Sequence, residues 1–174
     1  MIGSIRGRLI VKQPPDIVVE AMGVGYEIQV PMTTLFQLPA VGEEVLMLTH
    51  FVVREDAQLL YGFVDDTDRQ LFRQLIKVNG VGPKLALAIL SGMDAVAFAR
   101  CVGRNDVNAL VALPGVGKKT AERLIVEMRD RLGDWLSQLS PQGEDGGDTV
   151  STNTMHDPVT DAESALVALG YKPQ

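Results

Sequence analysis

The sequence predicts a multi-domain protein: an N-terminal OB-fold β-barrel, a central all-α domain with two helix–hairpin–helix motifs, a flexible linker and an incomplete small C-terminal helical domain. Three observations predict this order. In the N-terminal part, short apolar segments alternate with turn residues. In the central part, apolar residues recur with the period of a helix, and the composition then becomes polar toward the C-terminus. We therefore place the domains at 1–64, 65–136, 137–158 and 159–174.

The N-terminal block is rich in Ile, Val, Leu and Tyr, a composition typical of strands. Pro14-Pro15, Gly23, Pro39 and Gly42 separate its apolar segments. We expect strands at 2–11, 16–21, 26–30, 43–53 and 57–63. Five short strands suit a small closed or half-closed barrel of the OB type. An SH3-like barrel is the alternative, and the pattern alone does not separate the two.

The central block is expected to hold about five short helices. Two segments repeat apolar residues at intervals of three and four, which places those residues on one helix face. They are Leu71, Phe72, Leu75 and Ile76, and later Ala121, Leu124, Ile125 and Met128. Asp94 and the pair Asn105-Asp106 are expected to cap helix N-termini between these segments.

Residues 137–158 are polar and rich in Gly, Ser, Thr and Pro, which is typical of a flexible linker. The stretch 159–174 is expected to form one amphipathic helix. A single helix does not bury its apolar face alone. This helix therefore either docks elsewhere or belongs to a small domain whose remainder is missing.

The net charge of −6 is unevenly distributed along the chain. It is −3 over 1–63, +2 over 64–136 and −5 over 137–174. The overall acidity therefore does not exclude a nucleic acid partner, but it restricts the contact to a local surface, and only the central block is basic.

Other classes of protein and site are not favoured. No apolar run approaches the ~20 residues of a membrane span, and the N-terminus lacks a signal-peptide layout, so we expect a cytoplasmic protein without a membrane contact. Cys101 is a single cysteine, which excludes a disulfide framework. His50 and His156 lie far apart in the sequence with no convergent ligands, so no metal site is expected.

The central block contains an internal repeat. VNGVGPKLALAIL (78–90) and LPGVGKKTAERLI (113–125) align with an offset of 35 residues. The offset pairs Gly80 with Gly115, Val81 with Val116, Gly82 with Gly117 and Lys84 with Lys119. Each copy lies between two apolar helical segments, which predicts a helix, a two-glycine hairpin and a helix, twice.

The second copy also looks like a nucleotide-binding loop. A P-loop follows a strand and has the pattern G-x-x-x-x-G-K-[ST]. Ala112 stands where its first glycine belongs, and Lys119 stands where Ser or Thr would bind magnesium. A helix is expected before the loop, and Pro83 replaces the lysine in the first copy. We therefore exclude a nucleotide loop.

A hairpin that binds an anion fits the residues better. Two glycines permit a tight turn with positive φ and bring backbone amides close to a ligand. The following helix directs unpaired amides and its dipole toward an anion, and Lys84, Lys118 and Lys119 add positive charge. Such a hairpin holds a phosphate without reading a base. The alternative is that the glycines only turn the chain between packed helices.

The segments NGVGPKLA and PGVGKKTAERLI resemble the helix–hairpin–helix motifs of the RuvA family, which binds Holliday junctions in bacterial branch migration. MIGSIRG at the N-terminus, the turn at 23–26 and HFVVREDAQLLYGF (50–63) are also similar to the barrel of this family. The resemblance covers 1–136 and resumes at ALVALGYKPQ. The family has a small helical third domain at its C-terminus, and the resemblance to this domain extends over roughly its first helix only.

The resemblance implies structure-specific binding of four-way DNA junctions, which a four-fold homotetramer would hold open and planar for recombination and repair. The sequence does not distinguish this tetramer from a face-to-face octamer. The implied DNA contacts are Asn79, Gly80, Val81, Gly82, Lys84, Gly115, Val116, Gly117, Lys118, Lys119 and Thr120. We add Arg54 and Arg123 as supporting phosphate contacts.

The resemblance assigns Glu55 and Asp56 to an acidic pin near the crossover point. Two unit charges about 4 Å apart interact by up to about 4 kcal/mol at an effective dielectric of ~20. Separating a base-pair step costs about 1.4 kcal/mol, so a few carboxylates suffice to favour opening at the centre. From the residues alone, the alternative is an ordinary exposed turn between strands.

The resemblance further implies recruitment of a RuvB-type hexameric ring ATPase through the C-terminal region, at Leu166, Leu169 and Tyr171, with a RuvC-type resolvase as a further partner. The sequence has no ATP-binding motif, so ATP would be used by the motor. We therefore expect no cofactor and no catalysis by this chain alone.

Two rival functions come from other classes. A helix–hairpin–helix DNA glycosylase would use Lys119 as its nucleophile, but Ser137 stands about where its catalytic Asp belongs, and one cysteine does not suffice for an iron–sulfur cluster. A structural protein would use the hairpins only for packing.

Overall fold

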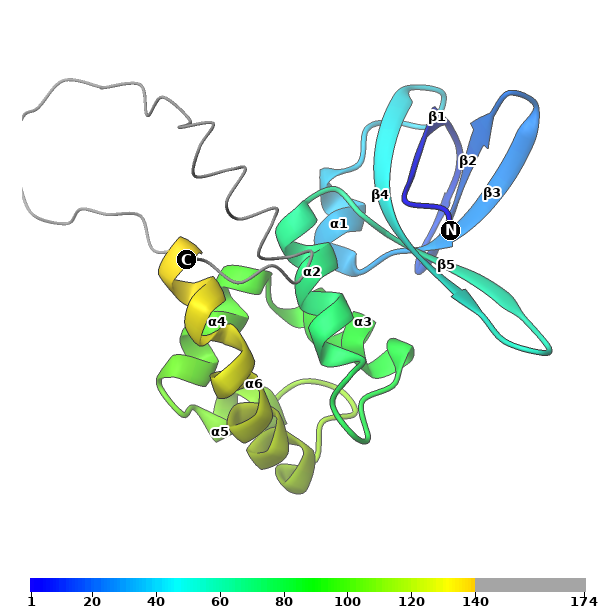
Figure 1. Cartoon of the computed structure of the whole chain (residues 1–174). Coiled ribbons are helices and arrows are strands. Elements are labelled where there is room, and N and C mark those ends of the chain that lie inside the picture. Colours follow the sequence, from blue (N-terminus) through cyan, green and yellow to red (C-terminus); the bar gives the residue numbers. More distant parts are fainter. Residues whose placement is uncertain (140–174) are drawn as a thin grey trace, which may run out of the picture. The chain divides into compact units, whose positions relative to one another are not determined.

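Residues 1–139 are described by the computed structural model, and they form a β-barrel and a set of helices that follow it in the chain (Figure 1). The expected C-terminal segment, with Leu166, Leu169 and Tyr171, lies outside the described residues, as do His156 and most of the expected linker.

Five strands close into a barrel in the order β1-β2-β3-β5-β4. They are β1 (Ser4–Gln13), β2 (Asp16–Ala21), β3 (Val24–Gln29), β4 (Glu44–Val53) and β5 (Gln58–Phe63). β1 pairs antiparallel with both β2 and β4, and β3 meets β5 in parallel at Gln29 and Tyr61. A closed five-stranded barrel of this order is an OB fold, which confirms the predicted barrel type.

Alternating side chains fill the barrel, because successive residues of a strand point to opposite faces. The inward set consists of Ile5, Leu9, Ile17, Val19, Ile28, Val45 and Met47, and each is at most 8% exposed. The predicted strands lie close to the observed ones, because apolar composition marks the strands and turn residues mark their ends.

A short helix between β3 and β4, α1 (Met32–Gln37), occupies a segment for which no helix is predicted. Its six residues span less than two turns, too few to repeat an apolar period. Leu35 and the following Leu38 pack into the barrel core. Tertiary packing therefore holds this helix, as is usual for short helices.

β4 has two partners along its length. Its first half pairs with β1, and its second half pairs with β5 from Leu48 to Val53. The two strands continue as a ribbon that projects from the barrel (Figure 1). The Arg54 amide donates a hydrogen bond to the Ala57 carbonyl at 2.8 Å and closes the turn at the tip.

Within the described residues, five helices follow the barrel, in agreement with the number expected for the central block. They are α2 (Asp66–Leu75), α3 (Pro83–Gly92), α4 (Ala95–Gly103), α5 (Val107–Val111) and α6 (Lys118–Leu139). The predicted apolar faces are buried, except that Ile76 is only partly covered. α6 continues to Leu139, so its last residues fall in the stretch that was assigned to the linker.

Carboxylates cap two of these helices as predicted. Asp94 Oδ1 accepts a hydrogen bond from the Ala97 amide at 2.7 Å, and Asp106 Oδ1 accepts one from the Ala109 amide at 3.0 Å. Asn105 is not the cap; it adopts a φ of +55°, a conformation that Asn tolerates better than most residues.

The barrel and the helices have separate apolar cores. The helical core extends onto the barrel at β5, where Phe72 of α2 lies 5.0 Å from Tyr61 and 5.1 Å from Phe63 between ring centroids. A second contact joins α1 to α3 through hydrogen bonds. These two contacts position the hairpins relative to the barrel.

Candidate nucleic-acid interface

The two glycine hairpins share one backbone hydrogen-bond pattern. In the first, the amides of Val78, Val81 and Ala86 donate to the carbonyls of Leu75, Val78 and Gly82, each at 3.0 Å. In the second, the amides of Leu113, Val116 and Ala121 donate to the carbonyls of Leu110, Leu113 and Gly117 at 3.1, 3.1 and 2.9 Å. Every donor and acceptor recurs 35 residues later, so the sequence repeat is a repeat of backbone geometry.

The first glycine of each pair makes the turn. Gly80 has a φ of +87° and Gly115 a φ of +82°, a region that costs other L-residues about 1–2 kcal/mol. A Cβ on Gly115 would also lie 3.3 Å from Cδ1 of Leu85 in the other motif. The fold itself therefore requires these two glycines.

The second glycine of each pair is different. Gly82 is extended, with a φ of −86°, and Gly117 does not have a positive φ either. No atom lies within 4 Å of where a Cβ would stand at either position. The expectation of positive φ is therefore wrong for these two residues. Their missing side chains leave the backbone open to close approach by another molecule.

Each hairpin leads into a helix whose first amides have no hydrogen-bond partner among the described residues. In the first motif these are the amides of Gly82, Lys84 and Leu85, since Pro83 has no N–H. In the second they are the amides of Gly117, Lys118, Lys119 and Thr120. Unpaired amides and the positive end of a helix dipole attract anions. The second motif therefore offers one donor more than the first.

Three lysines surround these amides. Lys84 lies in the first turn of α3, and Lys118 and Lys119 begin α6. All three are exposed, and no ion pair engages them in the part of the chain whose side chains are described. Their charge is therefore available to an incoming phosphate.

Val81 and Val116 serve the packing of the turns. Their side chains are 4% and 5% exposed, and their amides already donate within the hairpins. The direct DNA contact expected for them is therefore not favoured by the geometry. Asn79 is exposed, and Thr120 is half-buried at the start of α6.

Arg123 connects the two motifs. Its Nη1 donates a hydrogen bond to the backbone carbonyl of Asn79 at 3.1 Å, from α6 to the first hairpin. The same nitrogen lies 3.8 Å from the position of a Cβ on Gly80. The supporting phosphate contact expected of Arg123 is thus accompanied by a structural contact between the hairpins.

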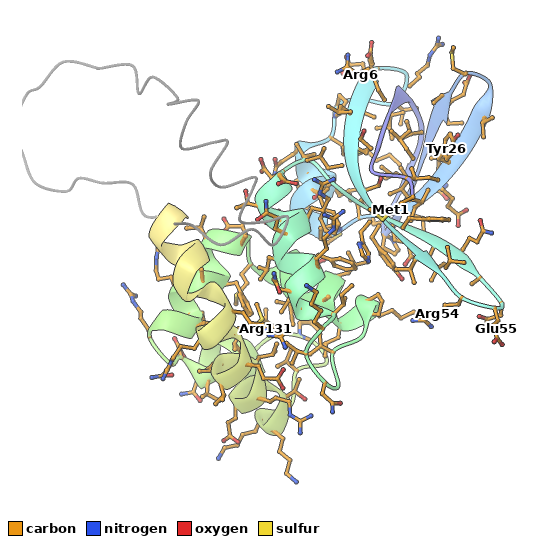
Figure 2. All side chains as sticks on the ribbon, viewed as in Figure 1. Met1, Arg6, Tyr26, Arg54, Glu55 and Arg131 are labelled. Carbon is orange, nitrogen blue, oxygen red and sulfur yellow. The ribbon has the colours of Figure 1, made fainter. Side chains whose placement is uncertain are left out.

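The predicted pin residues occupy the tip of the β4–β5 ribbon. Figure 2 shows Arg54 and Glu55 there, at the end that points away from the rest of the fold. Arg54, Glu55 and Asp56 are exposed, and none forms an ion pair with a described residue. The ribbon thus presents two carboxylates and one guanidinium to the surroundings.

Other side chains with reactive or metal-binding chemistry have structural surroundings. Cys101 is buried, its thiol donates to the Asp106 carbonyl at 3.3 Å, and burial raises its pKa. The His50 ring packs edge-on against Phe72 at 5.5 Å, and burial, with Arg73 and Arg69 nearby, lowers its pKa. Within residues 1–139 no group of three or more His, Cys, Asp or Glu residues is placed to hold a metal ion.

None of the described helices is by itself long and apolar enough to cross a membrane. α3 and α4 pass that test only as a pair, and the chain bends by 92° at the break between them. Both helices contribute residues to the helical core, among them Ile89, Leu90 and Phe98.

Two features of this interface are not detectable in the sequence. One is the bond between Arg123 and Asn79, which are 44 residues apart. The other is the contact of α1 with α3, across 57 to 59 residues. The repeat indicates that two hairpins exist, but no local pattern shows which side chains join them.

Comparisons with known proteins agree with this geometry. The family model of the RuvA N-terminal domain matches residues 1–62, and the model of the SAM-like helix-hairpin-helix tandem matches residues 72–130. Similar curated proteins carry the name Holliday junction branch migration complex subunit RuvA. Those of Marinobacter nauticus and Idiomarina loihiensis are each 58% identical over 100% and 99% of this chain and 85% of their own length. That of Pectobacterium atrosepticum is 56% identical over 100% of this chain and 86% of its own.

Proposed function

The chain belongs to the RuvA family, and from this premise we propose that it binds four-way DNA junctions as the DNA-binding subunit of a branch-migration complex. It recognises the shape of the junction through the phosphate backbone and does not read base sequence. Its role is in homologous recombination and DNA repair.

The observation that carries this proposal is the pair of hairpins that share one backbone hydrogen-bond pattern and present unpaired amides beside exposed lysines. Each hairpin ends at a glycine without a Cβ, Gly82 or Gly117, so a phosphate is able to approach the backbone closely. The helix dipole and the lysine then act on the same anion. Two such sites in one domain fit successive backbone contacts along a duplex arm.

Four-fold assembly extends this clamp to all four arms. A homotetramer would present eight hairpins around the four barrels, and stacking of two tetramers would enclose the junction. If each hairpin neutralises about one phosphate, log K falls with log salt at a slope of about −7. Affinity would then come from the hairpins, and its salt dependence is a direct measure of how many of them engage.

The ribbon tip acts at the centre of the junction. Glu55 and Asp56 are exposed and unpaired by any described cation, so they repel the phosphates of strands that cross there. This repulsion is small beside the binding of many phosphates, but comparable with the cost of opening a base-pair step, about 1.4 kcal/mol. The pin thus guides strand separation without abolishing binding.

The chain acts with partners and is not catalytic alone. A RuvB-type ring ATPase supplies the energy for strand movement and contacts the C-terminal segment through Leu166, Leu169 and Tyr171. A RuvC-type resolvase is a further partner on the same junction. The assembly works in the cytoplasm, where chromosomal junctions arise in bacteria, and the chain itself needs no cofactor.

Binding of a synthetic four-way junction and a linear duplex, measured against salt, tests the proposal. We expect the junction to bind more tightly, and the double variant Lys118→Gln/Lys119→Gln to lose about ten-fold or more in affinity with a shallower salt slope. Persistence of full affinity and slope in that variant would contradict the clamp.

The matched control is Arg100→Gln/Arg104→Gln, which removes the same charge from exposed positions of the same domain. Arg104 adjoins Asn105, which Arg129 contacts from a position 11 residues along α6 from Lys118. Eleven helical residues span about 16 Å, so this pair lies away from the hairpin. We expect its junction affinity and salt slope to remain near those of the unchanged chain.

A further inference from the structure

The contact between α1 and α3 is a small network of side-chain hydrogen bonds. The Met32 amide, at the start of α1, donates to Ser91 Oγ at 3.0 Å, and the Ser91 hydroxyl donates to the Leu87 carbonyl at 2.7 Å. The Thr33 hydroxyl donates to the Leu90 carbonyl at 2.8 Å. A serine of the helical domain thus caps a helix of the barrel, and a threonine of the barrel reaches back to α3. We call these bonds the α1–α3 joint.

The other contact between barrel and helices combines apolar packing with hydrogen bonds. Phe72 of α2 packs against His50, Tyr61 and Phe63. Two arginines of the same helix donate to barrel carbonyls, Arg69 to Gly3 at 3.0 Å and Arg73 to Thr49 at 3.5 Å. This contact anchors α2, whereas the joint anchors α3. Rotation about a single contact is the easiest motion between two domains, so the joint sets the angle as the second point of attachment.

A groove of about 350 Å³ lies beside the joint and separates much of α3 from the barrel. It is lined by Pro15, Gln29, Val30 and Met32 of the barrel, and by Lys84, Leu87, Ala88 and Ser91 of α3. Because the groove reaches from Ser91 to Lys84, close packing does not hold the hairpin end of α3 against the barrel. Relative to the barrel, α3 and the helical core to which it belongs are therefore held at the Ser91 end of the helix, by the joint.

α3 acts as a lever between the joint and the first hairpin. Ser91 lies in its last turn, and Lys84 lies in its first. Seven helical residues span about 10 Å, so a rotation of about 10° at the joint displaces the amides of Gly82 and Lys84 by about 2 Å relative to the barrel. The hairpin itself is unchanged by this rotation and is still able to bind a free duplex. The displacement exceeds the range of about 2.7–3.2 Å for an N–H···O hydrogen bond to a phosphate whose position is fixed by the junction centre.

We propose that Ser91 and Thr33 are positioning residues that set the angle between the barrel and the hairpins, and thereby determine the preference for a four-way junction over a linear duplex. This inference rests on the proposed function. A duplex requires only that the hairpins reach one backbone. A junction requires in addition that the arms held by the hairpins meet where the barrels and their ribbons lie. The angle across the joint therefore affects the junction and not the duplex.

The test is the double variant Ser91→Ala/Thr33→Val, which removes both hydroxyls and leaves the hairpins unchanged. Affinities for a synthetic four-way junction and for a linear duplex of equal length are measured at matched salt. We expect the ratio of the two affinities to fall about ten-fold, with duplex affinity and the solution mass of the assembly unchanged. The control variant Ser91→Thr/Thr33→Ser keeps both hydroxyls, and we expect its ratio of junction to duplex affinity to equal that of the unchanged chain.

The outcomes separate the inference from its premise. If the unchanged chain does not prefer the junction, the proposed function fails and the inference fails with it. If that preference exists but the double variant retains it, or loses duplex and junction affinity equally, the joint has no positioning role and the proposed function stands. A variant that does not fold is replaced by Thr33→Val alone, which removes one bond with little change in volume and is judged by the same ratio.

Discussion

Nη1 of Arg123 donates a hydrogen bond of 3.1 Å to the backbone carbonyl of Asn79 and so joins the second helix–hairpin–helix motif to the turn of the first. The reverse contact is apolar: Leu85 of the first motif lies beside Gly115 of the second. The two hairpins are therefore braced against each other, and we expect a change in one to affect the other.

The brace predicts energetic coupling between motifs. Arg123→Gln should weaken junction binding about ten-fold, because it removes a charge and releases the Asn79 carbonyl. In double-mutant cycles, Arg123→Gln should couple to Lys84→Gln in the other motif more strongly than to Lys119→Gln in its own. Fluorescence anisotropy with a labelled junction measures all the affinities.

Arg129→Gln is the matched control for this cycle. Arg129 is on the same helix and is also exposed, but it contacts Asn105 instead of a hairpin. It should show no coupling to Lys84→Gln. Additive effects of Arg123→Gln and Lys84→Gln would mean that Arg123 contacts only phosphate.

The two glycines of each hairpin should respond differently to substitution by alanine, the first with a loss of stability and the second with little change in stability. Gly80→Ala or Gly115→Ala places a Cβ at a φ above +80° and should lower the free energy of unfolding by about 1–2 kcal/mol. Gly82→Ala or Gly117→Ala meets open space. Ala is a poorer N-cap than Gly but restricts the unfolded chain, so the two effects should largely offset and change the free energy of unfolding by about 0.5 kcal/mol or less. Thermal unfolding and junction binding are measured for all four variants.

Gly82→Ala and Gly117→Ala should affect junction binding much more than they affect stability. The new methyl group at position 82 or 117 occupies the space that a phosphate would approach, so junction affinity should fall about ten-fold or more. Full affinity in both variants would show that no ligand comes close to these backbones.

Asp68 should limit stability at neutral pH. Its carboxylate is 5% exposed, accepts a hydrogen bond from the Ala95 amide at 3.1 Å, and has a pKa that burial raises above its usual value. The native state therefore binds this proton more tightly than the unfolded state, and the contribution to stability falls as pH rises through the raised pKa. Asp68→Asn keeps an acceptor and should raise Tm at pH 7, with a gain that shrinks as the pH falls to about 4.

Asp66 on the same helix provides a control, because its substitution should change Tm at pH 7 in the opposite direction. A hydrogen bond from Gln70, together with Arg69, lowers its pKa, so its contribution is present at neutral pH and is lost as the pH falls. Asp66→Asn should therefore lower Tm at pH 7 and have less effect in acid. If Asp68→Asn also lowers Tm at pH 7, the ionised carboxylate is stabilising and the predicted sign is wrong.

The ribbon tip should affect strand separation more than affinity. Glu55→Lys/Asp56→Lys reverses the charge at the tip without changing the hairpins, so junction affinity should stay the same or increase. A base analogue whose fluorescence increases on unstacking, placed at the junction centre, should report less opening with this variant than with the unchanged chain. Glu55→Gln/Asp56→Asn should fall between them, and identical signals from all three would rule out the pin.

Much of the architecture follows from local sequence. The alternation in β1, β2 and β4 and the spacing of Leu71, Phe72 and Leu75 reflect how a strand and a helix turn their side chains toward a core. The caps at Asp94 and Asp106 are also local, because a cap and its amide are three residues apart. The repeat predicted two hairpins because each depends on a glycine with positive φ within a few residues.

Three-dimensional packing decided what neighbouring residues do not specify. α1 exists because Leu35 enters the barrel core, and its six residues are too few to show a period. The same holds for the bonds from Arg123 to Asn79 and from Thr33 to Leu90, whose partners are 44 and 57 residues apart. The sequence by itself determined that this chain has a barrel and two glycine hairpins, since both depend on short-range patterns and turns. Only the tertiary structure decided how the hairpins are braced and aimed, because that depends on side chains that meet after the cores have formed.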